Sequence, residues 1–126
     1  MRVVHYAHEH LASIVAMCRA ENWPSYPADP DRAHDALRAP GSLTLVAVDG
    51  DVLGFAHALS DGWWGYLSLL LVAEPYRGRG VGGHLIAEVF RRSGVTRLDL
   101  VTDEAGEYYR DRPHTTFDGF RLYPRS

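Results

Sequence analysis

Residues 75–83 read Pro-Tyr-Arg-Gly-Arg-Gly-Val-Gly-Gly (PYRGRGVGG), and four of the six residues from Gly78 to Gly83 are glycine. The stretch lies between a strongly apolar run and the start of an amphipathic helical pattern. Glycines at such a junction let backbone N–H groups approach a ligand closely and adopt positive φ angles. The N-terminus of the following helix adds about half a positive charge and unpaired donors. The stretch therefore predicts a cradle for an anion, most naturally a pyrophosphate, with Arg77 and Arg79 adding positive charge.

The segments on either side of this stretch predict a central strand and an amphipathic helix. Before it, residues 63–72 (WWGYLSLLLV) are nearly all apolar, as expected of a strand covered on both faces. Trp63 and Trp64 are adjacent and should face opposite sides of that strand, so at least one should lie in the core. After the stretch, apolar residues recur at helical spacing over 81–93, and Gly94 ends the pattern.

The rest of the chain predicts a single-domain α/β protein over residues 1–126, with a mixed sheet and flanking helices. Two Asp-Gly turns, at residues 49–51 and 118–119, predict hairpins. Asp29 followed by Pro30 predicts a capped helix start. The further expected strands are 2–6, 43–48, 52–59, 97–101, 114–117 and 120–123, the further expected helices are 8–20, 30–38 and 103–110, and residues 21–30 are expected to form a loop.

Composition excludes several classes of function. The 126 residues carry a formal net charge of −3, and all 13 cations are arginine. Without lysine there is no P-loop lysine and no Schiff-base chemistry, and a mildly acidic chain is a poor nucleic-acid binder. Cys18, the single cysteine, excludes an internal disulfide and a Cys-rich zinc site, and its place on an apolar helical stripe predicts burial.

The chain also lacks patterns that would indicate a metal, a membrane or export. Its seven histidines show no paired spacing, so we expect no metal site. No apolar run approaches the ~18 residues of a membrane span, and no signal-peptide pattern is present. We therefore expect a cytoplasmic protein without a nucleic-acid or membrane partner.

Two classes of ligand would suit the glycine cradle. Gly78-x-Gly80-x-x-Gly83 formally matches the dinucleotide fingerprint GxGxxG. Residues 73–77 separate it from the strand, however, and the acidic residue about twenty positions on, Asp99, lies within an expected strand. Too little chain remains after Gly83 for a dinucleotide fold, so a nucleotide oxidoreductase is the weaker reading.

The better match is Arg77-x-x-Gly80-x-Gly82, which follows a strand ending Leu-Leu-Val and precedes a helix. This pattern resembles the acetyl-CoA motif of the GNAT family of N-acetyltransferases, written Gln/Arg-x-x-Gly-x-Gly/Ala. The order of expected elements is also similar to that of the family over nearly the whole chain. The resemblance implies the acyl-CoA N-acyltransferase fold and transfer of an acetyl group from acetyl-CoA to a primary amine.

The resemblance also implies roles for individual residues. In the family, the strand before the motif pairs with the pantetheine arm, the glycine stretch holds the pyrophosphate, and a tyrosine protonates the leaving thiolate. The Val72 N–H would polarise the thioester carbonyl, and the tyrosine, four residues after Ala105, would be Tyr109, with Tyr108 beside it. The cofactor-binding residues implied are Leu70, Leu71, Val72, Arg77, Gly78, Arg79, Gly80, Val81, Gly82 and Gly83.

Some residues depart from the family pattern. Where relatives with a carboxylate base carry it, eleven residues before the motif arginine, this chain has Tyr66. Ser68 shares a face with Tyr66 and could hold a water, and no residue is a strong candidate for the base. The segment from Tyr109 to Gly119 is longer than in the family, which leaves the choice between Tyr108 and Tyr109 open. These departures support a second hypothesis, that the chain is an acyl-CoA-binding or sensing module without turnover.

The acceptor is not specified by the sequence. A small-molecule amine and a peptide amine both remain open, with the net charge of −3 mildly favouring a cationic one. In this family the loop between the first two helices covers the acceptor side, so Glu21, Trp23 and Tyr26 are candidates to line that pocket. Many relatives pair as dimers, so a homodimer is open as well.

Overall fold

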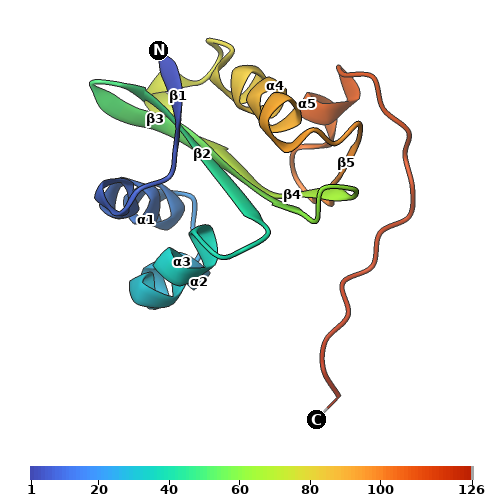
Figure 1. The fold of residues 1–126 in the computed structure, drawn as a ribbon, viewed down its shortest axis with the longest axis horizontal. Helices are drawn as coiled ribbons and strands as arrows, with labels where there is room; N and C mark the ends of the chain where they lie inside the picture. Colours follow the sequence, from blue (N-terminus) through green and yellow to red (C-terminus); the bar gives the residue numbers. More distant parts are fainter. Residues whose placement is uncertain (126) are drawn as a thin grey trace.

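The computed structural model describes residues 1–125 and contains one five-stranded mixed sheet (Figure 1). The strands lie in the sheet in chain order; the first four are antiparallel to their neighbours and the last pair is parallel. They are β1 (Arg2–His5), β2 (Ser42–Asp49), β3 (Asp51–Ser60), β4 (Gly65–Val72) and β5 (Leu98–Asp99). The predicted α/β class with a mixed sheet is confirmed.

Helices cover both faces of the sheet, one group on each (Figure 1). The helical elements are η1 (His8–His10), α1 (Leu11–Ala20), α2 (Ser25–Ala28), α3 (Pro30–Leu37), η2 (Glu74–Tyr76), α4 (Val81–Ser93) and α5 (Gly106–Arg110). Side chains of α1 and α3 pack with Phe55 and Leu71 in one apolar cluster. Those of α4 pack with Leu45 and Leu67 in the other. Thus the sheet has two cores, an α1/α3 face and an α4 face.

Most of the predicted elements are present. The hairpin of β2 and β3 turns at Gly50, whose φ is +74°. The helix predicted over 81–93 is α4, and Gly94 caps it in the left-handed conformation. The Asp29 side chain accepts a hydrogen bond from the Arg32 N–H at the start of α3, as the capping pattern predicts. The prediction that residues 21–30 form only a loop is wrong, because residues 25–28 form the short helix α2.

The start of the central strand differs from the prediction. Trp63 and Trp64 precede β4 in the turn from β3, where the Asp61 carboxylate accepts hydrogen bonds from both of their N–H groups. Their side chains are 76% and 53% exposed, so the prediction that one of them lies in the core is wrong. The strand alternation on which it rested does not apply, because the Asp61 turn holds both residues outside the sheet.

The predicted second hairpin does not form. Between residues 113 and 125 the chain has neither strand nor helix. It passes Val101, whose Cγ1 is 2.7 Å from the place of a Cβ added at Gly119, and its end lies away from the domain (Figure 1). Four large apolar side chains in this tail, those of Phe117, Phe120, Leu122 and Tyr123, are between 75% and 88% exposed. A hairpin needs a sheet edge or an apolar face to pack on, and β5, the edge strand, is only two residues long. The predicted strand over 97–101 is reduced to these two residues.

Two irregularities in β4 shape its outer edge. The strand pairs with β5 only through Gly65 and Tyr66, so its edge is open from there to Val72. On the β3 side, the register shifts so that His57 faces Leu69 and Ala58 faces Leu67. Ser68 is therefore the extra residue of a β-bulge.

Candidate functional site

The glycine stretch forms a turn with its surface open to solvent at the start of α4. Gly78 and Gly80 have φ angles of +77° and +82°, and Gly80 is the N-cap of α4. A Cβ added at either glycine would meet no atom within 4 Å. No side chain caps this helix end, so the N–H groups of its first turn are left for a ligand. A helix of this length with an uncapped N-terminus and a glycine-lined approach suits an anion.

The two arginines of the stretch have different surroundings. The Arg77 Nε donates to the Val72 carbonyl at 2.9 Å, and its guanidinium forms an ion pair with Glu21 at the end of α1. Its charge is thereby partnered, and Arg77 fastens the turn to β4 and α1. Arg79 is exposed and remains the arginine of the stretch with the freer guanidinium. The expected contribution of Arg77 to the positive charge of the cradle is therefore largely offset by Glu21.

The open edge of β4 presents backbone donors next to this turn. The Ala73 N–H donates to the Leu53 carbonyl on β3 at 2.9 Å. Successive N–H groups of a strand point to opposite sides, so the N–H groups of Val72 and Leu70 point away from β3. They face the edge of β4 that has no β5 partner, because β5 pairs only with Gly65 and Tyr66. An extended ligand could pair with β4 here as a further strand does.

Tyr108 and Tyr109 of α5 take different positions. The Tyr108 hydroxyl lies above the first turn of α4, 2.5 Å from the place of a Cβ added at Gly82, and Val72 Cγ2 is 3.7 Å from the same point. Tyr109 is half-buried and packs against the α4-face cluster. Burial raises the pKa of Tyr109; Tyr108 raises it further, while Arg112 lowers it. The structure thus brings the Tyr108 hydroxyl to the cradle and turns Tyr109 toward the core.

Arg112 was not identified from the sequence as part of this region. Its guanidinium donates to the Tyr108 hydroxyl at 2.8 Å and lies over the same ring, 4.7 Å from its centroid. One of its terminal nitrogens is 3.2 Å from the place of a Cβ at Gly83. The extra length after Tyr109 was the available signal, since a longer segment there can fold back over the start of α4.

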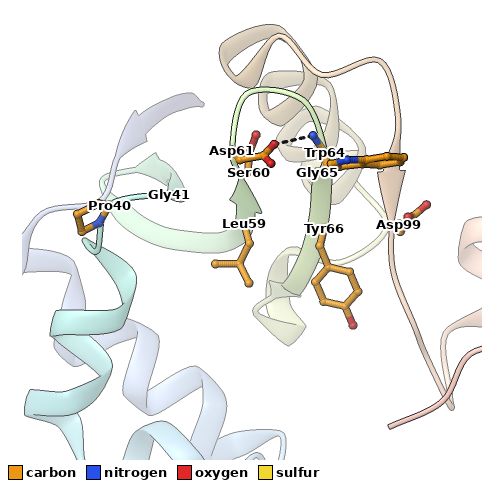
Figure 2. A pocket seen from close by; sticks show the side chains of 9 residues that line it. All are labelled: Pro40, Gly41, Leu59, Ser60, Asp61, Trp64, Gly65, Tyr66 and Asp99. Carbon is orange, nitrogen blue, oxygen red and sulfur yellow. Dashed lines mark hydrogen bonds between the residues drawn. The ribbon is translucent and has the colours of Figure 1, made fainter. Parts of the chain in front are cut away.

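A cavity of about 530 Å³ lies at the amino end of β4, where β4 pairs with β5 (Figure 2). The residues lining it are Pro40, Gly41, Leu59, Ser60, Asp61, Trp64, Gly65, Tyr66 and Asp99. Tyr66 and Asp99 are partners across β4 and β5, and the Asp61 carboxylate lies near the rim. The N–H groups of Trp64 and Trp63 hold the pKa of Asp61 below its usual value. The Trp64 ring is already covered by the Arg97 guanidinium, 4.2 Å from its centroid, which leaves two carboxylates and the Tyr66 ring as the groups that suit a cation.

The first-loop residues that are candidates to line an acceptor pocket do not belong to this cavity. Trp23 and Tyr26 are partly buried against the α1/α3-face cluster, and burial raises the pKa of Tyr26 to about 12. Glu21 is engaged by Arg77. None of the three lines the cavity in Figure 2.

Neither metal-binding clusters nor membrane-spanning helices occur in the described part of the chain. Across residues 1–125, no three His, Cys, Asp or Glu side chains gather in an arrangement that would hold a metal ion. No helix formed by these residues has the length and apolar character needed to cross a bilayer.

The chain matches a known family model over most of its length. The sequence model of the Acetyltransferase (GNAT) family matches residues 8–110. Among curated proteins, no sequence matches the chain.

Several solved structures share the fold at low sequence identity. The aminoglycoside N-acetyltransferase AAC(6')-Iy in complex with CoA is 22% identical, with a TM-score of 0.79 over 98% of this chain and 93% of that chain. A transcriptional regulator from Bacillus halodurans C-125 is 16% identical, with a TM-score of 0.76 over 97% of this chain and 98% of that chain. An aminoglycoside acetyltransferase from an uncultured soil metagenomic sample, in complex with trehalose, is 15% identical, with a TM-score of 0.71 over 98% and 95% of the two chains.

Proposed function

Because the chain belongs to the GNAT family of acetyltransferases, we propose that it transfers an acetyl group from acetyl-CoA to the nitrogen of a primary amine. The observation that carries the proposal is the open turn at Gly78–Gly83, set directly beside the unpaired edge of β4. The turn offers N–H groups for a pyrophosphate, and the edge offers N–H groups for an extended amide-containing arm. Together they match the two chemically distinct parts of CoA.

The arm has one direction along β4. The place of a Cβ at Gly82 is 3.7 Å from Val72 Cγ2, so Val72 already lies beside the cradle. An arm that starts at the cradle therefore runs past Val72 toward the amino end of the strand. We propose that Val72 pairs with the arm and that Leu70 N–H polarises the thioester carbonyl. This places the carbonyl one pleat further along β4 than the Val72 position implied by the resemblance.

We propose Tyr108 as the phenol that protonates the leaving thiolate. The Tyr108 hydroxyl accepts a hydrogen bond from Arg112, which leaves its own proton free for a ligand, and it lies over Gly82, whose Cβ position is also near Val72. A phenol with pKa about 10 can donate to a thiolate of pKa about 8.5 as the C–S bond breaks. Tyr109, the position implied by the resemblance, packs against the core instead. Tyr109→Phe should leave the transfer rate nearly unchanged, and Tyr108→Phe should lower it about 100-fold; the reverse order would restore Tyr109 as the acid.

The acceptor that suits the structure is a cationic amine. The cavity lined by Asp61 and Asp99 lies at the amino end of β4, beyond the acyl end of the arm. Solved structures of the same fold include aminoglycoside acetyltransferases, whose acceptors carry amines. We propose that residues 1–126 act as one catalytic domain in the cytoplasm on such an acceptor, small molecule or peptide.

The first test is thermal unfolding with acetyl-CoA, CoA or NADH in excess. At about 100 times its dissociation constant a ligand adds roughly 2.7 kcal/mol, which raises the midpoint by on the order of ten degrees for a chain of this size. We expect a rise with acetyl-CoA and CoA and none with NADH. If acetyl-CoA does not raise the unfolding midpoint, the glycine turn is not a site for acetyl-CoA.

Two glycines provide a matched pair of variants for the same test. Gly80 and Gly94 lie at opposite ends of α4, both left-handed, with φ of +82° and +74°, and both have open space at the Cβ position. Ala at either position carries the same backbone strain, roughly 1–2 kcal/mol. Gly80→Ala should weaken the response to CoA because its methyl group enters the cradle. Gly94→Ala should respond like the wild type.

A second candidate function is an acyl-CoA-binding module without turnover. It is favoured by one observation: β4 carries no carboxylate where relatives with such a base have one, the position being Tyr66. An amine panel with kanamycin, spermidine, benzylamine and a short peptide, followed by release of the CoA thiol, separates the two. If the protein binds CoA tightly but releases no CoA thiol from acetyl-CoA with any amine of the panel, it is a binding module.

A further inference from the structure

A buried histidine lies beside the open edge of β4. His57 of β3 is 6% exposed, and its partner across the sheet is Leu69, next to the bulged Ser68. Its two ring nitrogens each contact a serine hydroxyl: Nδ1 that of Ser68 and Nε2 that of Ser42, the latter at 2.9 Å. A buried imidazole with both nitrogens engaged has its orientation fixed.

Two arrangements of protons satisfy the hydrogen bonds of this cluster, because each serine hydroxyl also lies within reach of a backbone carbonyl: Ser42 of Ala36 at 2.9 Å, and Ser68 of His57 itself at 3.0 Å. In the first, Ser42 donates to its carbonyl and accepts from His57 Nε2–H; since a neutral imidazole has a single N–H, Nδ1 then holds a lone pair and accepts from the Ser68 hydroxyl. In the second, Ser68 donates to its carbonyl and accepts from Nδ1–H, while Ser42 donates to Nε2. Burial lowers the pKa of His57, which keeps the ring neutral, and the first arrangement leaves Nδ1 able to accept a proton.

This pair lies between the two parts of the proposed site. Leu59 and Tyr66, which line the acceptor cavity, are partners across β3 and β4. His57 is two residues from Leu59 along β3, and Ser68 is two residues from Tyr66 along β4. The side chains of His57 and Ser68 lie on the α1/α3 face, one pleat closer to the backbone of Leu70 than the cavity is. Ser68 is only half-buried, whereas His57 is buried. The serine is thus the member of the pair that an acceptor amine can reach.

We infer that Ser68 takes the proton from the acceptor amine and passes its own proton to His57, in place of the carboxylate base that β4 lacks. The inference rests on the proposed function. Ser68 is the catalytic residue of the relay, and His57 is the positioning residue that makes its oxygen basic. The sequence alone predicts only that Ser68 could hold a water.

The relay balances the reaction. The ammonium group gives one N–H proton to Ser68 Oγ while the Ser68 proton moves to His57 Nδ1, which leaves the amine nitrogen with its electron pair. That pair forms the C–N bond to the acetyl carbon as the C–S bond breaks. The sulfur takes the Tyr108 proton, and the second nitrogen proton returns to the phenolate through solvent. The imidazolium then releases its proton to solvent through Ser68, so that one proton is released per acetylation.

The first arm of the test needs no turnover. Nitrogen-15 NMR of the wild type near neutral pH, with the His57 signal assigned by its loss in His57→Gln, reports the tautomer of the ring. We expect a neutral ring with the proton on Nε2. A proton on Nδ1, or a fully protonated ring, would overturn the relay, because Ser68 would then have no lone pair to donate to.

The second arm compares two benzyl acceptors whose amino groups differ in basicity. Benzylamine is cationic near neutral pH, whereas O-benzylhydroxylamine is neutral and needs no base before attack. In His57→Gln and Ser68→Ala, we expect acetylation of benzylamine to fall about 100-fold in kcat, with KM for acetyl-CoA unchanged. Acetylation of O-benzylhydroxylamine should stay near the wild-type rate, and Ser68→Thr, which keeps the hydroxyl, should retain both activities. An equal loss with the two acceptors would overturn the relay.

Thr44→Ala is the matched control. Its hydroxyl donates to the Leu37 carbonyl at 2.7 Å, just as Ser42 reaches Ala36, but it has no bond to His57. This variant should not change the ratio of rates for the two acceptors. If the wild type acetylates no amine at all, it is the proposed transferase function that fails; if the wild type is active and Ser68→Ala matches it, the relay alone fails.

Discussion

At the residue scale, the adjacent Tyr108 and Tyr109 of α5 contact different parts of the molecule. The glycine motif and the helix behind it were predictable because their spacing is local. Which of two adjacent tyrosines reaches the cradle depends on how α5 sits against α4, and this is a tertiary contact: the Tyr108 hydroxyl packs over Gly82 while Tyr109 packs into the core. Arg112 was missed for the same reason.

Cys18 allows a direct test of the core at this scale. It is 1% exposed, and burial raises the pKa of its thiol to about 11. The thiolate, which is the reactive form, is therefore scarce near neutral pH. We expect no labelling by a disulfide reagent in the native protein and full labelling in denaturant. Rapid labelling of the native protein would show that the α1/α3-face core is open.

At the element scale, the start of α3 illustrates a local rule that holds. Asp29 accepts from the Arg32 N–H, so Asp29→Ala should destabilise the protein by about 1 kcal/mol. This corresponds to a fall of roughly 3–5 °C in the unfolding midpoint for a chain of this size. Asp31 lies in the first turn of the same helix and is the control for charge alone. An equal fall of the unfolding midpoint in Asp31→Ala would show that the stabilisation comes from negative charge near the helix dipole and not from the capping hydrogen bond.

Two glycines near the open edge should respond differently to alanine. A Cβ at Gly54 would lie 2.7 Å from the Leu71 carbonyl oxygen, which is backbone and cannot move without parting β3 from β4. Gly54→Ala should therefore cost about 1–3 kcal/mol. A Cβ at Gly82 meets the end of the Tyr108 side chain, which can rotate away. Chemical denaturation of Gly82→Ala should show little loss of stability, and a loss as large as that of Gly54→Ala would mean that Tyr108 is fixed.

Element boundaries failed where tertiary contacts override local pattern. The helix over 81–93 is bounded by glycines and was predicted to the residue. The strand before it was predicted to begin at Trp63, because apolar residues continue there, but the Asp61 carboxylate captures the next two N–H groups and delays β4 to Gly65. The tail has a hairpin pattern at 118–119 but no strand edge long enough to receive it.

At the scale of the whole molecule, the tail adds exposed apolar surface without joining the core. We expect removal of residues 114–126 to change the unfolding midpoint little, because Phe117, Phe120, Leu122 and Tyr123 are exposed. Scanning calorimetry of the shortened chain checks this. A large, concentration-dependent fall would show instead that the tail packs against a second copy, and sedimentation of the full chain at several concentrations would then detect the homodimer.

The two faces of the sheet serve different parts of the proposed reaction. Tyr108 approaches β4 from the α4 face, while His57 and Ser68 lie on the α1/α3 face. The proposed donor and acceptor of protons are thus separated by the sheet itself, and only a ligand at its open edge can contact both.

The bulge at Ser68 has a consequence for how this protein can vary through evolution. Leu67 and Gly65 are buried on the α4 face because one extra residue in β4 resets the alternation before Leu69. Deleting Ser68 would remove the bulge, make the pairs of Leu69, Leu67 and Tyr66 consecutive, and leave Leu67 and Tyr66 on their present faces. Descendants of this gene should therefore lose a residue from β4 more easily at position 68 than elsewhere in the strand, so that its retention would reflect the proposed role of Ser68 and not the packing of the core.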